Sequence, residues 1–157
     1  MIKKIKIIFI LFISFLMVSC GFKKINQNRP LIHVQNISIE GENRISSFLK
    51  NDINLFSDKD AITKYDVVVN LKKTKRDIIK NTSGKITRYR LNISANLVLK
   101  NNNNKKITNR SFNKEGTFDV AKNHFETINN EKIMTKVIMD QLGDEIINFI
   151  TFSNKNR

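Results

Sequence analysis

The chain contains a single cysteine, Cys20, and this limits the thiol chemistry open to it. One cysteine among 157 residues excludes an internal disulfide, a thiolate-ligated zinc finger and a CxxC redox pair. The thiol remains a good nucleophile, which suits it to forming a thioether. His33 and His124 lie far apart in the sequence, and we expect no metal site from them.

The residues before Cys20 have the organisation of an export signal. Three lysines within residues 1–6 precede an apolar run from Ile7 to Val18 that only Ser14 interrupts. A charged segment, an apolar run of about a dozen residues and a small residue before the cut are typical of a secretory signal peptide. A transmembrane helix needs roughly 20 apolar residues, so we expect a signal peptide over residues 1–19. An uncleaved membrane anchor is the alternative.

The four residues Met17-Val18-Ser19-Cys20 resemble a bacterial lipobox. In that motif the cysteine thiol receives a diacylglycerol, and the cysteine becomes an N-acylated first residue after cleavage. Several acyl chains anchor a protein stably, whereas one binds only marginally. Gly21 stands where an aspartate would favour retention in the inner membrane. We therefore expect lipidation of Cys20, no other cofactor, and anchoring at the periplasmic leaflet of the outer membrane, with residues 20–31 as a tether.

The chain is strongly basic, with 28 Lys and Arg against 14 Asp and Glu, a formal net charge of +14. Loss of residues 1–19 would remove three lysines and leave +11. Such a charge usually suggests nucleic acid, but an exported lipoprotein does not meet it. The expected partners are anionic envelope components: lipopolysaccharide, acidic lipid headgroups or cell-wall polymers.

The densest basic residues fall on either side of a turn signal at Thr82-Ser83-Gly84. If the flanking strands pair as a hairpin, both groups lie at one end of a sheet. Arginine can bind a phosphate through two hydrogen bonds and lysine as a point charge. The alternative is a solvated sheet face or an ordinary protein contact. The candidate residues for binding lipopolysaccharide phosphates are Lys72, Lys75, Arg76, Arg88 and Arg90, with Lys73 in the same cluster.

No residues converge on a catalytic pattern. Ser83 has no partner base or oxyanion motif, and the five glycines fall singly rather than in a phosphate-binding loop. We expect no enzymatic activity.

Hydrophobic patterning beyond residue 31 predicts four strands and two helices. Alternation predicts strands over about 33–39, 65–72, 88–99 and 106–114, and asparagines 101–104 are the expected left-handed tip of a hairpin. Helical spacing predicts one helix over about 45–56, with Asn43 as its N-cap. It predicts a second after Gly116, which Asn129-Asn130 could interrupt. The expected core stripe of that last helix is Phe125, Ile128, Met134, Val137, Ile138, Leu142, Ile146, Phe149 and Ile150.

This order of elements predicts an α+β fold: a two-layer sandwich of a mostly antiparallel four-stranded sheet with two helices on one face (β-α-β-β-β-α). The first strand should pair in parallel, because a helix connects it to the next strand. We expect one domain over residues 32–152, a tail over 153–157, and a polar, partly basic open face.

With these features the chain resembles the LptE family of lipopolysaccharide-assembly lipoproteins. The resembling segments are Cys20-Gly21-Phe22, Thr87–Leu91, Ala95–Leu99, Phe118-Asp119 and the closing helix over residues 123–150. Lys23-Lys24-Ile25 stands where that family often has a basic residue and a proline. The resemblance covers nearly the whole mature chain, as a pattern rather than a diagnostic motif.

The resemblance implies a non-catalytic role at the outer membrane. Members of the family sit as a plug inside the large β-barrel LptD, assist its folding and help lipopolysaccharide reach the outer leaflet. Binding of lipopolysaccharide through basic residues is also attributed to them. The alternative is a generic outer-membrane lipoprotein that binds an anionic envelope polymer or scaffolds an envelope complex, using the same basic charge without a barrel partner.

Overall fold

The computed structural model describes residues 32–155. The expected signal peptide, Cys20 and the tether lie outside these residues. In chain order the elements are β1 (Ile32–Glu40), α2 (Asn43–Phe56), β2 (Thr63–Lys80), β3 (Ile86–Asn101), β4 (Ile107–Asp119) and α3 (His124–Lys155). The predicted order of strands and helices is confirmed, and α3 continues three residues beyond the expected domain end at 152.

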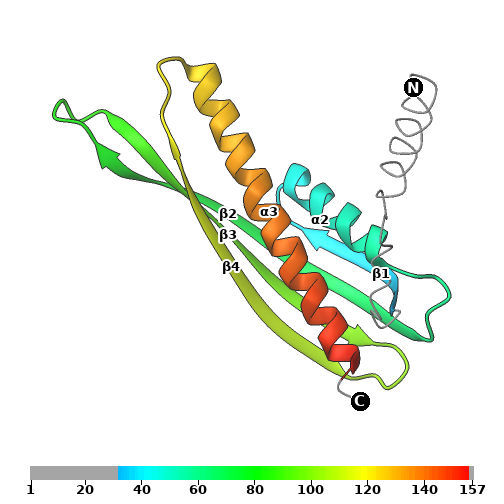
Figure 1. The fold of residues 1–157 in the computed structure, drawn as a ribbon. Helices are drawn as coiled ribbons and strands as arrows, with labels where there is room; N and C mark the ends of the chain where they lie inside the picture. Colours follow the sequence, from blue (N-terminus) through cyan, green and yellow to red (C-terminus); the bar gives the residue numbers. More distant parts are fainter. Residues whose placement is uncertain (1–31, 156–157) are drawn as a thin grey trace, which may run out of the picture.

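The four strands form one sheet in the order β1-β2-β3-β4. β1 pairs with β2 in parallel, and the other two pairs are antiparallel. Both helices lie on the same side of this sheet (Figure 1). The α+β two-layer fold predicted from the sequence is therefore confirmed.

The core lies between the two helices and the covered face of the sheet. Alternate residues of β2 and β3 point into it, because successive side chains of a strand face opposite ways. Burial of each large aliphatic side chain contributes about 1.5–3 kcal/mol. The largest fully buried side chains are Ile32, Ile45, Leu49, Ile53, Leu91, Ile93, Leu97, Ile138, Met139, Leu142, Ile146 and Ile150. Within residues 32–155 neither helix combines the length and apolarity that crossing a membrane requires.

A β2–β3 hairpin projects beyond the rest of the sheet (Figure 1). β1 pairs with β2 only as far as Asn70, whereas β2 and β3 stay paired to Lys80 and Ile86. The predicted end of this strand near Lys72 was wrong by eight residues. The backbone of β3 supplies hydrogen bonds to these residues even though their side chains no longer alternate between core and solvent.

β4 also extends further than the sequence indicated. Gly116, after which a helical pattern was expected, pairs with Leu91 of β3 and remains in the strand. A Cβ atom on this glycine would clash with the Met134 side chain of α3, so the glycine permits close packing of helix on sheet rather than ending the strand. α3 begins at His124 and runs through Asn129 and Asn130 without interruption.

Two predicted backbone roles of asparagine were also wrong. Asn43 is the first residue of α2, and Glu42 occupies the cap position without a capping side-chain hydrogen bond. In the loop between β3 and β4 the left-handed residue is Lys105, with φ of 58°. Asn101 acts there through its side chain, whose Oδ1 accepts hydrogen bonds from the backbone of Asn103 and Asn104.

The apolar stripe of α3 is only partly buried. Ile138, Leu142, Ile146 and Ile150 are core residues as predicted. The expected core residues at the other end of the helix are exposed: Phe125, Ile128 and Val137 have exposed fractions of 75%, 37% and 42%. The fully buried apolar side chains of α3 begin only at Ile138, so the first turns of the helix keep apolar side chains that the fold does not cover.

Gly41 makes the turn from β1 into α2 possible, and its replacement tests that turn. Its φ is +137°, and a Cβ atom there would lie 2.7 Å from the carbonyl oxygen of Leu71. We predict that Gly41→Ala lowers the free energy of unfolding by about 3 kcal/mol, from backbone strain and this clash. Urea denaturation followed by circular dichroism measures it.

Gly84→Ala is the matched control, because Gly84 also has a positive φ, +78°, but has open space around it. It should cost only about 1 kcal/mol, the strain of a left-handed residue with a side chain. Equal losses for both variants would show that the Leu71 contact does not constrain the turn.

Candidate functional site

The β2–β3 hairpin brings the predicted basic groups to the same end of the sheet. Arg76 lies directly opposite Arg90, and Arg88 lies opposite Ile79. The arrangement follows from antiparallel pairing around the turn at 81–85, where Gly84 donates its backbone N–H to the carbonyl of Asn81. Residues on both sides of a hairpin turn become neighbours in this way.

The strands separate this cluster onto two faces of the sheet. Lys73 and Lys75 lie opposite Ile93 and Leu91, which are buried beneath the helices. Lys75 therefore belongs to the covered face and does not join the other candidates. Of the predicted binding residues, the four whose side chains lie on the open face are Lys72, Arg76, Arg88 and Arg90. A contiguous basic run in the sequence becomes two smaller groups, because side chains alternate along a strand.

Each open-face arginine of β3 is paired with a carboxylate of β4. Arg88 Nε donates a hydrogen bond to Asp119 Oδ1 at 2.5 Å, and an Arg90 Nη1 lies 4.0 Å from Glu115 Oε2. The hydrogen bond from Arg88 lowers the pKa of Asp119 and raises the pKa of Arg88 itself. An anionic ligand would have to compete with these carboxylates for both guanidinium groups.

A polar groove of about 490 Å³ lies on the open face beside these pairs. Arg76 and Arg90 line it together with Asp77 and Glu115, so its formal charges balance. Thr74, Asn92 and Asn113 add neutral polar side chains, and the Asn92 side-chain amide donates a hydrogen bond to Asn113 Oδ1 at 2.7 Å. The groove offers amide and guanidinium hydrogen bonds rather than a strongly positive field.

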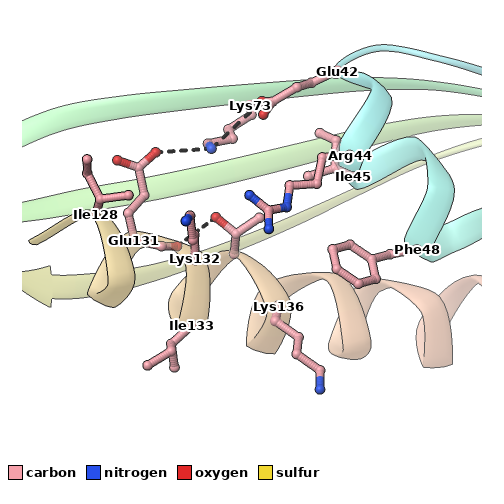
Figure 2. A pocket seen from close by; sticks show the side chains of 11 residues that line it. Glu42, Arg44, Ile45, Phe48, Lys73, Ile128, Glu131, Lys132, Ile133 and Lys136 are labelled. Carbon is pink, nitrogen blue, oxygen red and sulfur yellow. Dashed lines mark hydrogen bonds and ion pairs between the residues drawn. The ribbon is translucent and has the colours of Figure 1, made fainter. Parts of the chain in front are cut away.

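On the covered face, Glu131 of α3 holds the two lysines of β2. Lys73 Nζ lies 3.0 Å from Glu131 Oε1 (Figure 2). Lys75 Nζ lies 2.8 Å from Glu131 Oε2. Lys73 also lies 3.7 Å from Glu42 at the start of α2. Burial raises the pKa of Glu131, but the hydrogen bonds and charges of Lys75 and Lys73 outweigh it and leave the pKa lowered. The cluster ties α3 to the projecting hairpin.

Sequence reasoning missed the acidic partners Glu115, Asp119 and Glu131. Glu115 and Asp119 lay outside the predicted strand, which was expected to end near Lys114. A helix was expected to follow Gly116. Continued alternation through Thr117 and Phe118 was the signal for a longer strand. No local pattern identifies Glu131 as the partner of residues 56 and 58 positions earlier.

Comparison with known proteins identifies the fold but gives no close relative. No protein-family profile matches the chain, and no curated protein sequence matches it significantly. The crystal structure of rare lipoprotein B from Shewanella oneidensis is similar, with a TM-score of 0.61 over 79% of this chain and 97% of that chain, at 10% identity. The chain has the fold of a bacterial lipoprotein.

A second lipoprotein structure agrees. The solution structure of uncharacterized lipoprotein B from Nitrosomonas europaea has a TM-score of 0.60, with 14% identity, and covers 81% of this chain and 86% of that chain. At these identities the likeness concerns the fold of the chain. Both neighbours are described as lipoproteins. This description agrees with the lipobox-like motif at residues 17–20 of this chain, which is an independent observation.

The Glu131 cluster predicts an acid-sensitive contribution to stability. We expect Glu131→Gln to lower the free energy of unfolding by about 1–2 kcal/mol at pH 7, because charge-assisted hydrogen bonds to Lys73 and Lys75 are lost. The folded-state pKa of Glu131 lies below its ordinary value of 4.5. The contribution should therefore be full above that value and disappear as the pH falls through the lowered pKa. Urea denaturation at a series of pH values measures it.

The control is Asp60→Asn, which changes the same charge at an exposed loop residue. Its stability should follow that of the unmodified chain at every pH. A Glu131→Gln deficit that persists unchanged at pH 3 would contradict the ion-pair explanation.

Proposed function

We propose that this chain is an outer-membrane lipoprotein that supports a large LptD-like β-barrel in the insertion of lipopolysaccharide into the outer leaflet. The observation that carries the proposal is the shared fold with rare lipoprotein B, whose family is structurally related to LptE. The lipobox-like motif ending at Cys20 supports lipid anchoring of the same chain. Its role is to bind and stabilise other molecules, with no catalytic step and no cofactor beyond the lipid on Cys20.

The open face of the sheet is suited to contact with the interior of a barrel. The lumen of an outer-membrane barrel is polar, so a plug gains little from an apolar surface there. The open face offers paired amides and hydroxyls, including the hydrogen bonds between Asn92 and Asn113 and between Ser111 and Asn96. Its arginines already have acidic partners in β4, which lowers the cost of bringing them out of water.

The same arginines are candidates for transient contact with lipopolysaccharide phosphates. Both lie at the end of the sheet that projects with the hairpin, and arginine can offer two parallel hydrogen bonds to a phosphate. Asp119 and Glu115 would compete with the phosphate for these hydrogen bonds. The pairing would weaken binding and so favour passage of the lipid over its retention.

Purification of the full lipoprotein from membranes tests the barrel partnership. We predict that the tagged chain, solubilised in detergent, recovers one very large β-barrel in a one-to-one ratio. Cys20→Ala should release the chain from the membrane fraction and reduce that recovery. A lipoprotein that stays in the outer membrane but recovers no barrel would instead favour the generic role of binding an anionic envelope polymer.

If the arginines contact lipopolysaccharide phosphates, two double variants should change the affinity for lipopolysaccharide in opposite directions. Arg88→Ala with Arg90→Ala should weaken lipopolysaccharide binding about tenfold at physiological salt, through the loss of charge-assisted hydrogen bonds. Glu115→Gln with Asp119→Asn should strengthen it, because both guanidinium groups become free. Lys100→Ala, on the open face at the far end of β3, is the control. If the carboxylate variant binds no better than the unmodified chain, the arginines do not contact the phosphates.

A further inference from the structure

A groove of about 410 Å³ lies between the start of α2 and the first half of α3 (Figure 2). It is on the covered side of the sheet, away from the open-face arginines. α2 contributes Arg44, Ile45 and Phe48 to its lining, while α3 contributes residues between Ile128 and Lys136. Neither helix fills the space, because the fully buried apolar side chains of α3 begin only at Ile138.

The apolar part of the groove is accessible. Ile45 is fully buried and forms part of its inner wall, whereas Phe48 and Ile128 each keep an exposed fraction of 37% and Ile133 keeps 55%. Ile128 belongs to the stripe that the sequence predicts as core. Apolar side chains that share an open groove favour an apolar ligand, because its burial removes their remaining surface from water.

Three cations border this apolar surface without an acidic partner. Among residues 32–155 no carboxylate lies within 4.0 Å of Arg44, Lys132 or Lys136. In Figure 2 the guanidinium group of Arg44 lies between the two helices. Lys73, by contrast, is paired with Glu131 and Glu42 at one end of the groove. The six charged residues of the lining carry a net charge of +2.

We propose that this groove binds an anionic lipid with a single acyl chain, its chain against Phe48 and Ile128 and its headgroup held by Arg44, Lys132 and Lys136. The unpaired cations complement a phosphate or carboxylate, and an arginine among them can bind either through two hydrogen bonds. The volume is near the lower end of the roughly 300–1,000 Å³ of ligand pockets, so it accommodates one chain and not several. This binding does not require a barrel partner.

The absence of tryptophan from the chain permits a direct test. Phe48→Trp places a unique tryptophan, which can be excited selectively over the two tyrosines, in the groove of the full lipoprotein. The lipoprotein is reconstituted in phosphatidylcholine nanodiscs. Lysophosphatidylglycerol with a brominated acyl chain is then added as a quencher. Lys50→Trp, at an exposed position of α2 outside the groove lining, is the matched control for quencher in the bilayer.

We expect saturable quenching of the Phe48→Trp protein at one lipid per chain and little quenching of the Lys50→Trp protein. Adding Arg44→Gln, Lys132→Gln and Lys136→Gln to the Phe48→Trp protein should weaken binding at least tenfold. Brominated lysophosphatidylcholine, with the same chain and no net charge, should also bind at least tenfold more weakly.

Two results would overturn the proposal. Equal quenching at both reporter positions would show only partition into the bilayer, and an unchanged affinity in the triple variant would exclude the cations as the headgroup site. If Phe48→Trp perturbs folding, as judged by circular dichroism, Ile133→Trp provides a second reporter at a more exposed position of the same lining. The outcome is independent of barrel recovery, so the two proposals can fail separately.

Discussion

The structure depends on the pairing of β3 with β2 on one side and with β4 on the other. Leu91, Ile93, Ala95, Leu97 and Leu99 of β3 are almost completely buried, while the residues that alternate with them are polar or exposed. A shift of one residue in either pairing would move one of the neighbouring strands onto the wrong face. The apolar face must therefore carry the helices, and every polar residue of the open face is fixed in register with its neighbours.

This register decides where the basic charge of the protein can act. Lys73 and Lys75 come to the helix side, where Glu131 neutralises them. Arg88 and Arg90 come to the open side, where the register places Asp119 and Glu115 within reach. Most of the ion pairs among the described residues therefore involve the basic residues of the β2–β3 hairpin. Pairing of this kind stabilises a projecting hairpin whose residues make few core contacts.

The fold could be predicted from the sequence because period-two and period-3.6 patterns were unambiguous wherever one face is buried. Leu91 to Leu99 and Ile138 to Ile150 show this. Prediction failed over Lys72–Lys80, where pairing with β3 rather than burial maintains the strand, because backbone hydrogen bonds leave no trace in hydrophobicity. It failed after Gly116 because a glycine usually suggests the end of a strand, although Phe118 beyond it is buried. The individual basic residues were identified, but their division between two faces and their acidic partners depend on register, which local patterns do not specify.

The groove between α2 and α3 shows why composition alone misplaces a binding surface. A cation that has a carboxylate within about 4 Å attracts a second anion less strongly, because the carboxylate offsets its field. An unpaired cation beside apolar side chains attracts an anion more strongly, because the surroundings have a lower dielectric constant than water. Arg44, Lys132 and Lys136 are separated in the sequence and form no basic run. They converge because α2 begins beside the first half of α3. The attraction for anionic ligands thus follows the unpaired cations of the helices as well as the basic run of the sheet.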